Sequence, residues 1–261
     1  MATYDVPVRR YKIDKLPVEV HPSREEMGSA AAAMAQEVLR GAIASRGTAN
    51  LILATGNSQL TFLHTLRDMP EIDWKKVRVF HMDEYLGIPA DHPASFPLFL
   101  HRHILDAVKP HAFYPIPGQP DDVQEACNHY ADLLQRYPAD LVVLGIGENG
   151  HLAFNDPPYA KFDDPEWVKL VALDETSRRQ QVGEGHFPTL ESVPTHAITL
   201  TIPALLAAGR VLAIVPEARK VNAVRACLYE PVSEERPGSI LRTVEHATLY
   251  LDPESAQGLK E

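Results

Sequence analysis

The sequence has few cysteines, no long apolar run and no basic segment. Only Cys127 and Cys227 occur, and they form no Cys-x-x-Cys pair, so neither a disulfide framework nor a structural zinc site is indicated. No apolar run approaches the roughly 18 residues that a membrane-spanning helix needs, and the start of the chain has no signal-peptide pattern. We therefore expect a soluble, cytoplasmic protein without a membrane partner.

Positive charge is also in short supply. Lys and Arg number 25 against 35 Asp and Glu, which gives a formal net charge of −10 with His neutral. An acidic surface argues against a nucleic-acid partner, because phosphate backbones are bound by clustered Lys and Arg. A small anionic substrate is still compatible, since it responds to the local field. With 261 residues, of which 45% are hydrophobic, the chain can bury a sizeable core, and we predict one domain over residues 1–261.

Short apolar segments alternate with segments of helical pattern along most of the chain. We predict strands at 18–20, 50–54, 77–82, 141–144, 197–200, 211–215 and 248–251, after an otherwise irregular stretch at 1–20. We predict helices at 24–45, 58–67, 95–108, 122–135, 203–208 and 220–228. Such alternation is typical of βαβ units. It predicts an α/β fold with a doubly wound, mainly parallel, Rossmann-like sheet and helices on both faces.

Residues 159–194 do not fit this alternation. They are polar, rich in Asp, Glu, Gln and Arg, and contain glycines at 183 and 185. Long segments of this kind are usually functional, so we interpret this one as a mobile lid over the site. A passive surface excursion is the alternative.

The most informative stretch begins at the apolar run 141–144. Three glycines follow within six residues: Gly145, Gly147 and Gly150. A polar cluster accompanies them and consists of Asn149, His151, Asn155 and Asp156. Ligands of open α/β sheets bind at the carboxyl ends of strands, where this cluster would lie. A dinucleotide-binding turn is disfavoured because two prolines follow too soon for its helix, and a plain Gly-rich turn is the alternative.

Two further segments indicate an anion site. The turn Thr55-Gly56-Asn57-Ser58 lies between a predicted strand and a predicted helix, where backbone N–H groups and the helix dipole attract anions. Lys220 opens the helix after strand 211–215. A cation is an unusual choice there because the dipole favours acids, and a bound phosphate would explain it. A solvated lysine is the alternative.

Candidate acid–base groups come from the same sheet edge. Asp83 follows strand 77–82, where partial burial would raise its pKa and suit a base; capping of the next turn is the alternative. Histidine is the residue type whose unperturbed pKa lies near neutrality, so His151 suits an acid. Asp156, five residues on, is placed to orient the imidazole. Without a His-Glu-x-x-His or similar pattern, the chemistry does not call for a metal.

The run Gly-Ile-Gly-Glu-Asn-Gly-His-Leu-Ala-Phe-Asn-Asp-Pro at 145–157 resembles the hallmark of the glucosamine-6-phosphate deaminase family, whose wider group includes the 6-phosphogluconolactonases. The resemblance extends over about residues 51–255. It implies conversion of glucosamine 6-phosphate and water to fructose 6-phosphate and ammonium, in amino-sugar catabolism and without a cofactor. The partner it implies is a phosphorylated amino sugar, and a homo-oligomer is compatible with it.

The resemblance also implies roles for single residues. His151 would open the sugar ring, Asp83 in Met-Asp-Glu-Tyr-x-Gly would transfer the proton, and Asn149 and Asp156 stand where members often have Asp and Glu. Substrate contacts are implied at Thr55, Gly56, Asn57, Ser58, Glu84, Gly147, His186 and Lys220. A lid cation usually completes the phosphate site, and here the candidates are Arg178, Arg179 and His186.

Three other functions stay open. A 6-phosphogluconolactonase usually carries Gly-His-x-Ala-Ser-Leu-Phe-Pro, whereas this chain has Ala-Phe-Asn-Asp-Pro. A sugar-phosphate sensor of a repressor needs a helix-turn-helix, for which the first 50 residues offer no basic segment. An enzyme for another sugar phosphate is kept open by the departures from the family pattern, which are Asn57, Gln59, Asp156 and His186.

Some family members are activated by the N-acetylated sugar phosphate, which binds a Ser-Ser pair after the hallmark and an Arg-x-Lys near the next strand. The matching residues here are Pro158-Tyr159-Ala160-Lys161, and the one cation near the second position is Lys169. A single exposed lysine binds phosphate weakly without the fork of an arginine. The resemblance therefore implies an unregulated enzyme.

Overall fold

The computed structural model describes residues 8–157, 159–183 and 185–260. Its framework is an eight-stranded sheet in the order β1-β2-β11-β10-β7-β3-β4-β6, in which every pair is parallel except β1–β2. The strands are β1 (Arg9–Ile13), β2 (Leu16–Val20), β3 (Ala49–Leu53), β4 (Val77–His81), β6 (Ala112–Tyr114), β7 (Leu141–Leu144), β10 (Arg210–Val215) and β11 (Ala247–Leu251). The predicted mainly parallel α/β sheet is confirmed.

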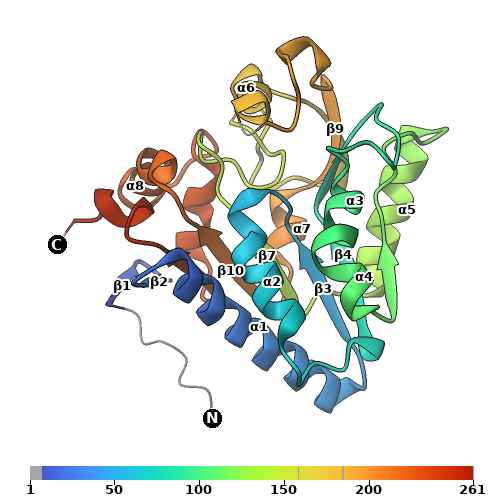
Figure 1. Ribbon diagram of the computed structural model, residues 1–261. Coiled ribbons are helices and arrows are strands. Elements are labelled where there is room, and N and C mark those ends of the chain that lie inside the picture. Colours follow the sequence, from blue (N-terminus) through green and yellow to red (C-terminus); the bar gives the residue numbers. More distant parts are fainter. Residues whose placement is uncertain (1–7, 158, 184, 261) are drawn as a thin grey trace.

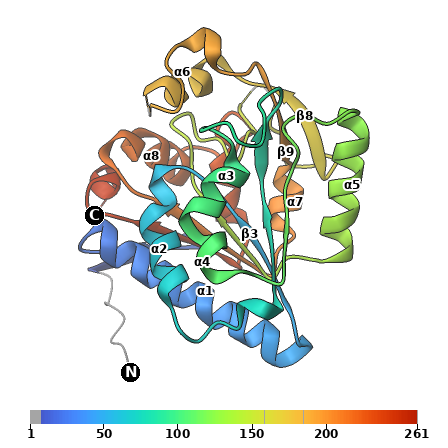
Figure 2. The same ribbon diagram turned by 45° about the vertical axis from the view of Figure 1, so that its right-hand side comes forward.

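Helices cover both faces of this sheet because its central strands are apolar on both sides. Leu141 and Val143 of β7 pack in one core cluster, and Val142 and Leu144 pack in another, as the alternation of side chains along a strand requires. The first cluster contains α1 (Arg24–Arg46), α2 (Leu60–Asp68) and α3 (Phe96–Leu100), and the second contains α5 (Val123–Arg136), α7 (Ile202–Leu206) and α8 (Val221–Tyr229). Figure 2 shows α2 and α5 on opposite sides of the strands.

Helix α1 has the ends that the sequence predicts. The Ser23 hydroxyl accepts a hydrogen bond from the backbone N–H of Glu26 (3.1 Å), and Gly47 ends the helix with φ +79°. The helix expected from residue 58 starts instead as a short 3-10 turn, Asn57–Gln59, before α2. The helix from 95 to 108 is continuous, but its middle turn, His101–Leu105, is a π-helix that leads into α4 (Asp106–Val108).

The prediction of irregular structure was wrong for residues 9–17, while residues 1–7 lie outside the described residues. Strand β1 pairs antiparallel with β2 at the sheet edge, and the hairpin turns at Asp14, whose φ is +52°. Strand β1 is largely exposed, so it carries no apolar pattern that would mark it in the sequence. Strand β6 was not predicted either, because its three half-buried residues are too few to show an alternation.

A second, three-stranded antiparallel sheet stands apart from the first, in the order β5-β9-β8. It consists of β5 (Asp83–Tyr85), β9 (His196–Leu200) and β8 (Val168–Ala172). The predicted strand at 197–200 is thus present, but it belongs to this sheet. Segment 159–194 is not a loop throughout, since it contains β8 and α6 (Glu175–Gly183). Figure 1 shows α6 at the top of the molecule, away from the helices that flank the large sheet.

The order of the strands in the large sheet reverses its direction at β3, and this reversal positions the site. Strand β3 lies between β4 and β7; the chain continues from β3 to β4 on one side and from β7 to β10 on the other. Such a switch point opens a crevice at the carboxyl ends of the two strands. In the part of the chain that the structure describes, no helix is long and apolar enough to cross a membrane.

Candidate functional site

A cavity lies at the carboxyl ends of β3, β4 and β7 and holds about 840 Å³ of empty space, part of it open to solvent. Most of the predicted site residues line it: Thr55, Gly56, Asn57, Ser58, Asp83, Gly147, His151, His186 and Lys220. Three predicted residues do not line it, namely Glu84, Asn149 and Asp156. Each of these three contacts a lining residue or its neighbour, as described below.

The turn after β3 is built for close approach of a ligand to its backbone. Gly56 has φ +96°, a conformation that glycine adopts without strain. Gln59, buried beneath the turn, donates from Nε2 to the carbonyl of Ile214 at the end of β10 (3.3 Å). Arg24 of α1 donates to the carbonyl of Asn57. The turn is therefore fixed to two other elements. It directly precedes α2, so its backbone N–H groups lie at the N-terminal end of that helix, where anions are favoured.

Two cations face the cavity from the end of β10. Lys220 is only 5% exposed and lines the cavity together with Arg219. The Arg219 guanidinium lies 2.6 Å from Glu217 and 3.3 Å from Glu148. Glu217 has φ +82° and ψ +140°. This backbone conformation is strained for any residue except glycine, and residues that adopt it are often found at functional sites. Arg219 was missed in the sequence, although it directly precedes Lys220.

Neither lid arginine reaches the cavity. Arg178 donates to the carbonyls of Leu190 (2.7 Å) and Val193 (3.0 Å) within the lid segment, and Arg179 pairs with Glu175 on its own helix. The lid residues that line the cavity are Gln180, Gln181 and His186. Of the three predicted candidates for the phosphate contact, the structure thus brings only His186 to the cavity.

The hydrogen bonds of His151 define which ring nitrogen faces the ligand. Its Nδ1 lies 2.7 Å from Oδ1 of Asn149 and 3.0 Å from Oδ1 of Asp156. Asn149 donates from Nδ2 to the same Asp156 oxygen (2.9 Å), which assigns its Oδ1 to the imidazole. The two nearest neighbours of Nδ1 are acceptors, and the Ser177 hydroxyl lies farther away at 3.3 Å. We infer that Nδ1 carries hydrogen and that Nε2 is the nitrogen that exchanges a proton.

Asp156 is fully buried behind His151 and is an anion. Burial raises its pKa, but hydrogen bonds from His151, Asn149 and Ser177 outweigh burial and hold the pKa at about 2. The shorter Asp, in place of the family's Glu, therefore makes the direct contact with the imidazole. Ser177 was missed because nothing near it in the sequence marks it; the fold of the lid brings its hydroxyl to 2.6 Å from the carboxylate.

Asp83 and Glu84 form a pair of buried carboxyl groups at the start of β5. Burial, and then the charge of Glu84, raise the pKa of Asp83 well above its ordinary value. Burial also raises the pKa of Glu84, to about 7, although Glu84 accepts from the Ser95 hydroxyl (2.9 Å) and from the N–H of Tyr85 and Phe96. Glu84 thus does not face the cavity. It binds the segment that contains Phe96, and Phe96 lines the cavity.

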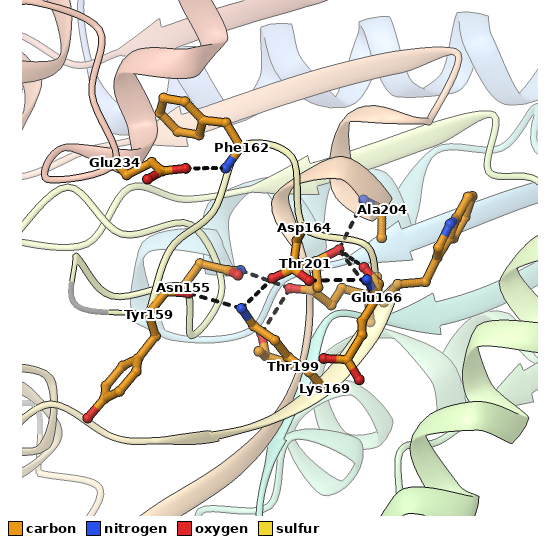
Figure 3. Close-up of polar contacts among 12 residues, drawn as sticks. Asn155, Tyr159, Phe162, Asp164, Glu166, Lys169, Thr199, Thr201, Ala204 and Glu234 are labelled. Atoms are coloured by element: carbon orange, nitrogen blue, oxygen red, sulfur yellow. Dashed lines mark hydrogen bonds and ion pairs between the residues drawn. The ribbon is translucent and has the colours of Figure 1, made fainter.

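The hallmark loop is fastened to the second sheet by buried polar groups. Asn155 donates from Nδ2 to the carbonyls of Leu152 and Leu200 (both 2.8 Å), and Thr199 accepts from the N–H of Phe154 (3.1 Å). Figure 3 shows Asn155 and Thr199 within this cluster, beside the Lys169–Asp164 pair. These bonds keep the loop that carries His151 and Asp156 in one place.

Metal ligation is not indicated by the geometry. Across residues 8–157, 159–183 and 185–260, no group of three or more His, Cys, Asp or Glu side chains is placed to hold a metal ion. What the arrangement offers is a buried carboxyl group and an imidazole at one end of a cavity and an anion-binding turn with two cations at the other.

Comparison with known proteins places the chain near sugar-phosphate enzymes. The family model described as glucosamine-6-phosphate isomerases/6-phosphogluconolactonase matches residues 22–250. A glucosamine-6-phosphate deaminase of Bacillus cereus (strain B4264) is 32% identical over 231 residues, which are 88% of this chain and 84% of that protein.

Solved structures show the same fold. A monomeric glucosamine-6-phosphate deaminase superposes with a TM-score of 0.85 at 26% identity, over 93% of this chain and 99% of that one. A 6-phosphogluconolactonase from Shewanella baltica OS155 superposes with a TM-score of 0.76 at 19% identity, over 93% of this chain and 100% of that one. At that identity the lactonase shares the fold, and nothing further follows from it.

Proposed function

The chain belongs to the glucosamine-6-phosphate isomerase/6-phosphogluconolactonase family, and from that premise we propose that it is a glucosamine-6-phosphate deaminase. It would convert glucosamine 6-phosphate and water to fructose 6-phosphate and ammonium. One observation carries the proposal: a single cavity joins Asp83, whose pKa is raised, and His151, which is backed by an anionic Asp156, to an anion-binding turn and Lys220.

The phosphate end would fix the substrate at a distance from the chemistry. Backbone N–H groups of the 55–58 turn bind the phosphate oxygens, and the buried Lys220 neutralises part of its charge. Arg219 lies at the same end and adds less positive charge, because Glu217 and Glu148 already pair with it. These contacts place the sugar ring toward His151 and Asp83.

The first chemical step is ring opening. The protonated His151 gives the hydrogen of Nε2 to the ring oxygen as the bond between C1 and that oxygen breaks and the hydroxyl on C1 releases its proton to water; Nδ1–H stays bonded to Asn149 and Asp156. The carboxylate of Asp156 stabilises the imidazolium before the transfer, as the third member of a catalytic triad does. The product of this step is the open-chain amino aldehyde.

The second step moves a proton between neighbouring carbons. The Asp83 carboxylate removes the proton from C2 while the aldehyde oxygen takes up a proton, which gives an enolamine. Asp83 then returns its proton to C1 as the amine nitrogen loses one, which leaves an imine at C2 and a hydroxyl on C1. Water then adds to C2 and ammonia departs, taking up a proton as ammonium, so that the ketose remains. A base is most effective when its pKa lies near the working pH, and burial of Asp83 moves its pKa in that direction.

The lactonase and sensor alternatives are less well supported. Hydrolysis of a lactone needs no base that carries a proton from C2 to C1, yet Asp83 is buried in the cavity wall with a raised pKa. A sensor needs to bind the sugar phosphate but has no use for the His151–Asp156 pair. The deaminase uses both groups.

The test is an assay of the purified protein with a panel of phosphorylated sugars. We expect glucosamine 6-phosphate to give ammonium and fructose 6-phosphate in equal amounts. Galactosamine 6-phosphate, mannosamine 6-phosphate and 6-phosphogluconolactone are tested as alternative substrates in separate reactions. Lactone hydrolysis without ammonium release would replace the proposal by a lactonase, and faster ammonium release from another hexosamine phosphate would replace the substrate.

A further inference from the structure

A hydroxyl group from the lid segment completes the environment of the His151–Asp156 pair. Ser177, in the first turns of α6, is only 3% exposed. Its Oγ lies 2.6 Å from Oδ1 of Asp156 and 3.3 Å from Nδ1 of His151. It does not line the cavity, so it can act on a substrate only through these two residues.

We propose that Ser177 is a positioning residue that orients Asp156 toward His151 and makes that orientation depend on the lid helix. The proposal rests on the proposed deaminase function for its kinetic consequence, but the contact itself is independent of the reaction.

The direction of the hydrogen bond follows from the charge of Asp156. An ionised carboxylate only accepts hydrogen bonds, so the Ser177 hydroxyl donates. A length of 2.6 Å is that of a charge-assisted O–H···O⁻ bond, which is stronger than a bond between neutral groups. Such a bond restricts rotation of the Asp156 carboxylate.

Three donors converge on one oxygen of Asp156. Oδ1 receives Nδ2 of Asn149, Nδ1 of His151 and Oγ of Ser177, whereas Oδ2 is buried without a hydrogen-bond partner in the described part of the chain. The terminal torsion of an aspartate is broad and nearly two-fold. Without Ser177 the Asp156 carboxylate would rotate so that Asn149 and His151 bind different oxygens. The Nδ1–H group of His151 would then point less directly at the carboxylate.

The two sides of this contact are anchored differently. Asp156 follows Asn155, which is tied to β9 by two buried hydrogen bonds (Figure 3). Ser177 belongs to α6, where the next residue, Arg178, is bonded to carbonyls of the lid segment itself. The same helix supplies Gln180 and Gln181 to the cavity wall. The position of α6 therefore sets both the Ser177–Asp156 contact and this part of the cavity wall.

The expected consequence is on turnover rather than on substrate affinity. In Ser177→Ala we expect kcat to fall about tenfold or more, as loss of a hydrogen bond to a charged group predicts, with KM changed by less than about twofold. Ser177→Thr keeps the hydroxyl and restores most of the activity. Thr176→Ala, an exposed neighbour on the same helix, is the matched control and leaves kcat unchanged.

A double-mutant cycle separates positioning from a general structural role. If Ser177 acts through the Asp156 carboxylate, Ser177→Ala changes kcat by less than about twofold in an Asp156→Asn background, because the charge that it orients is gone. An equal loss in both backgrounds, or wild-type kcat in Ser177→Ala, overturns the proposal.

A second readout does not depend on the reaction. With ¹⁵N-labelled histidine, the Nδ1–H signal of His151, assigned by its loss in His151→Gln, should shift in Ser177→Ala and stay in place in Thr176→Ala. An unchanged signal in Ser177→Ala overturns the proposal. A wild-type protein that releases no ammonium, but shows this shift, contradicts the proposed function and leaves the contact established.

Discussion

The imidazole of His151 lies directly against the backbone of Gly147. A Cβ atom at Gly147 would lie 2.1 Å from Cε1 and 2.3 Å from Nδ1 and Nε2 of that ring, which no real pair of atoms tolerates. The imidazole therefore packs directly on the backbone of Gly147, and its Nδ1 is bound by Asn149 and Asp156. The position of the His151 ring therefore requires a glycine at 147.

The first prediction tests this relationship. Gly147→Ala should displace the ring from Asp156 and lower kcat by about 10²–10⁴, the usual contribution of a positioned acid. The melting temperature should change little, since the displaced ring borders the cavity. Gly41→Ala, where a Cβ meets nothing within 4 Å, is the control. Steady-state kinetics and thermal unfolding of both variants check the prediction, and wild-type turnover in Gly147→Ala would contradict it.

Asp83→Asn should abolish isomerisation and ammonium release and leave the fold intact. The carboxyl group is buried and its pKa is raised, so a neutral amide of the same shape replaces it at little cost in stability. Loss of a positioned base typically lowers the rate by about 10²–10⁴. Ammonium release by the purified variant is the measurement, and near wild-type turnover would remove Asp83 from the mechanism.

Substitution of Glu84 should change the pH dependence of the reaction. Asp83 acts as a base only when ionised, so kcat/KM falls as the pH drops through its pKa, which lies well above the ordinary value of about 4. The charge of Glu84 contributes to that rise. Glu84→Gln removes the charge, lowers the pKa of Asp83 and moves the acidic limb to lower pH.

A pH–rate profile for wild type and Glu84→Gln measures this shift. Because the two carboxyl groups are neighbours, the wild-type limb reports the pair rather than either group alone. Glu245→Gln, a remote carboxylate whose side chain is 81% exposed, should leave the limb in place. A limb at the same pH in Glu84→Gln, or one moved to higher pH, would argue that Glu84 does not act on Asp83 electrostatically.

The elements that could be predicted are those whose signal is local. Helix α1 has a capping residue, Ser23, and an αL glycine, Gly47, at its ends, and β7 is an apolar run long enough to be recognised. Strand β1 could not be predicted, because an exposed strand is defined by its partner β2 and not by its own composition. The same holds for β8, which pairs with β9 inside a polar segment.

In the site, residue types could be predicted but side-chain directions could not. Asp83 and His151 line the cavity as expected. Glu84 follows Asp83 directly, yet its carboxylate turns to Ser95, because successive side chains of a strand point to opposite faces. Ser177 and Arg219 reach the site through the lid and through the end of β10, and such approaches depend on tertiary packing.

At the phosphate end, Lys220→Ala should raise KM for the phosphorylated sugar far more than it lowers kcat. In the proposed function Lys220 would bind a group remote from the reacting carbons and so would contribute equally to the ground state and the transition state. Arg219→Ala should raise KM less, because Glu217 and Glu148 already neutralise that guanidinium. Steady-state kinetics of both variants decide the order, and an unchanged KM in Lys220→Ala would exclude it from the phosphate site.

The last prediction concerns regulation, and the structure alters its basis. We expected Lys169 to be an exposed cation near the position of the effector site, and that was wrong. Its ammonium group lies 2.6 Å from the Asp164 carboxylate and 2.9 Å from the Tyr159 carbonyl, and the Lys169 side chain is only 12% exposed (Figure 3). Pro158, the first residue of the matching stretch, lies outside the described residues.

A phosphate at this position would have to displace Asp164, which would leave a buried carboxylate without its partner. Removing one partner of a buried ion pair is strongly unfavourable, so N-acetylglucosamine 6-phosphate should neither bind here nor activate the enzyme. We expect hyperbolic kinetics with and without this compound, and the same curve shape in Lys169→Met. Initial rates against substrate concentration make the comparison. If the curve were sigmoidal and the N-acetyl compound straightened it, other residues of the chain would form an effector site, since Lys169 is already bound within its own subunit.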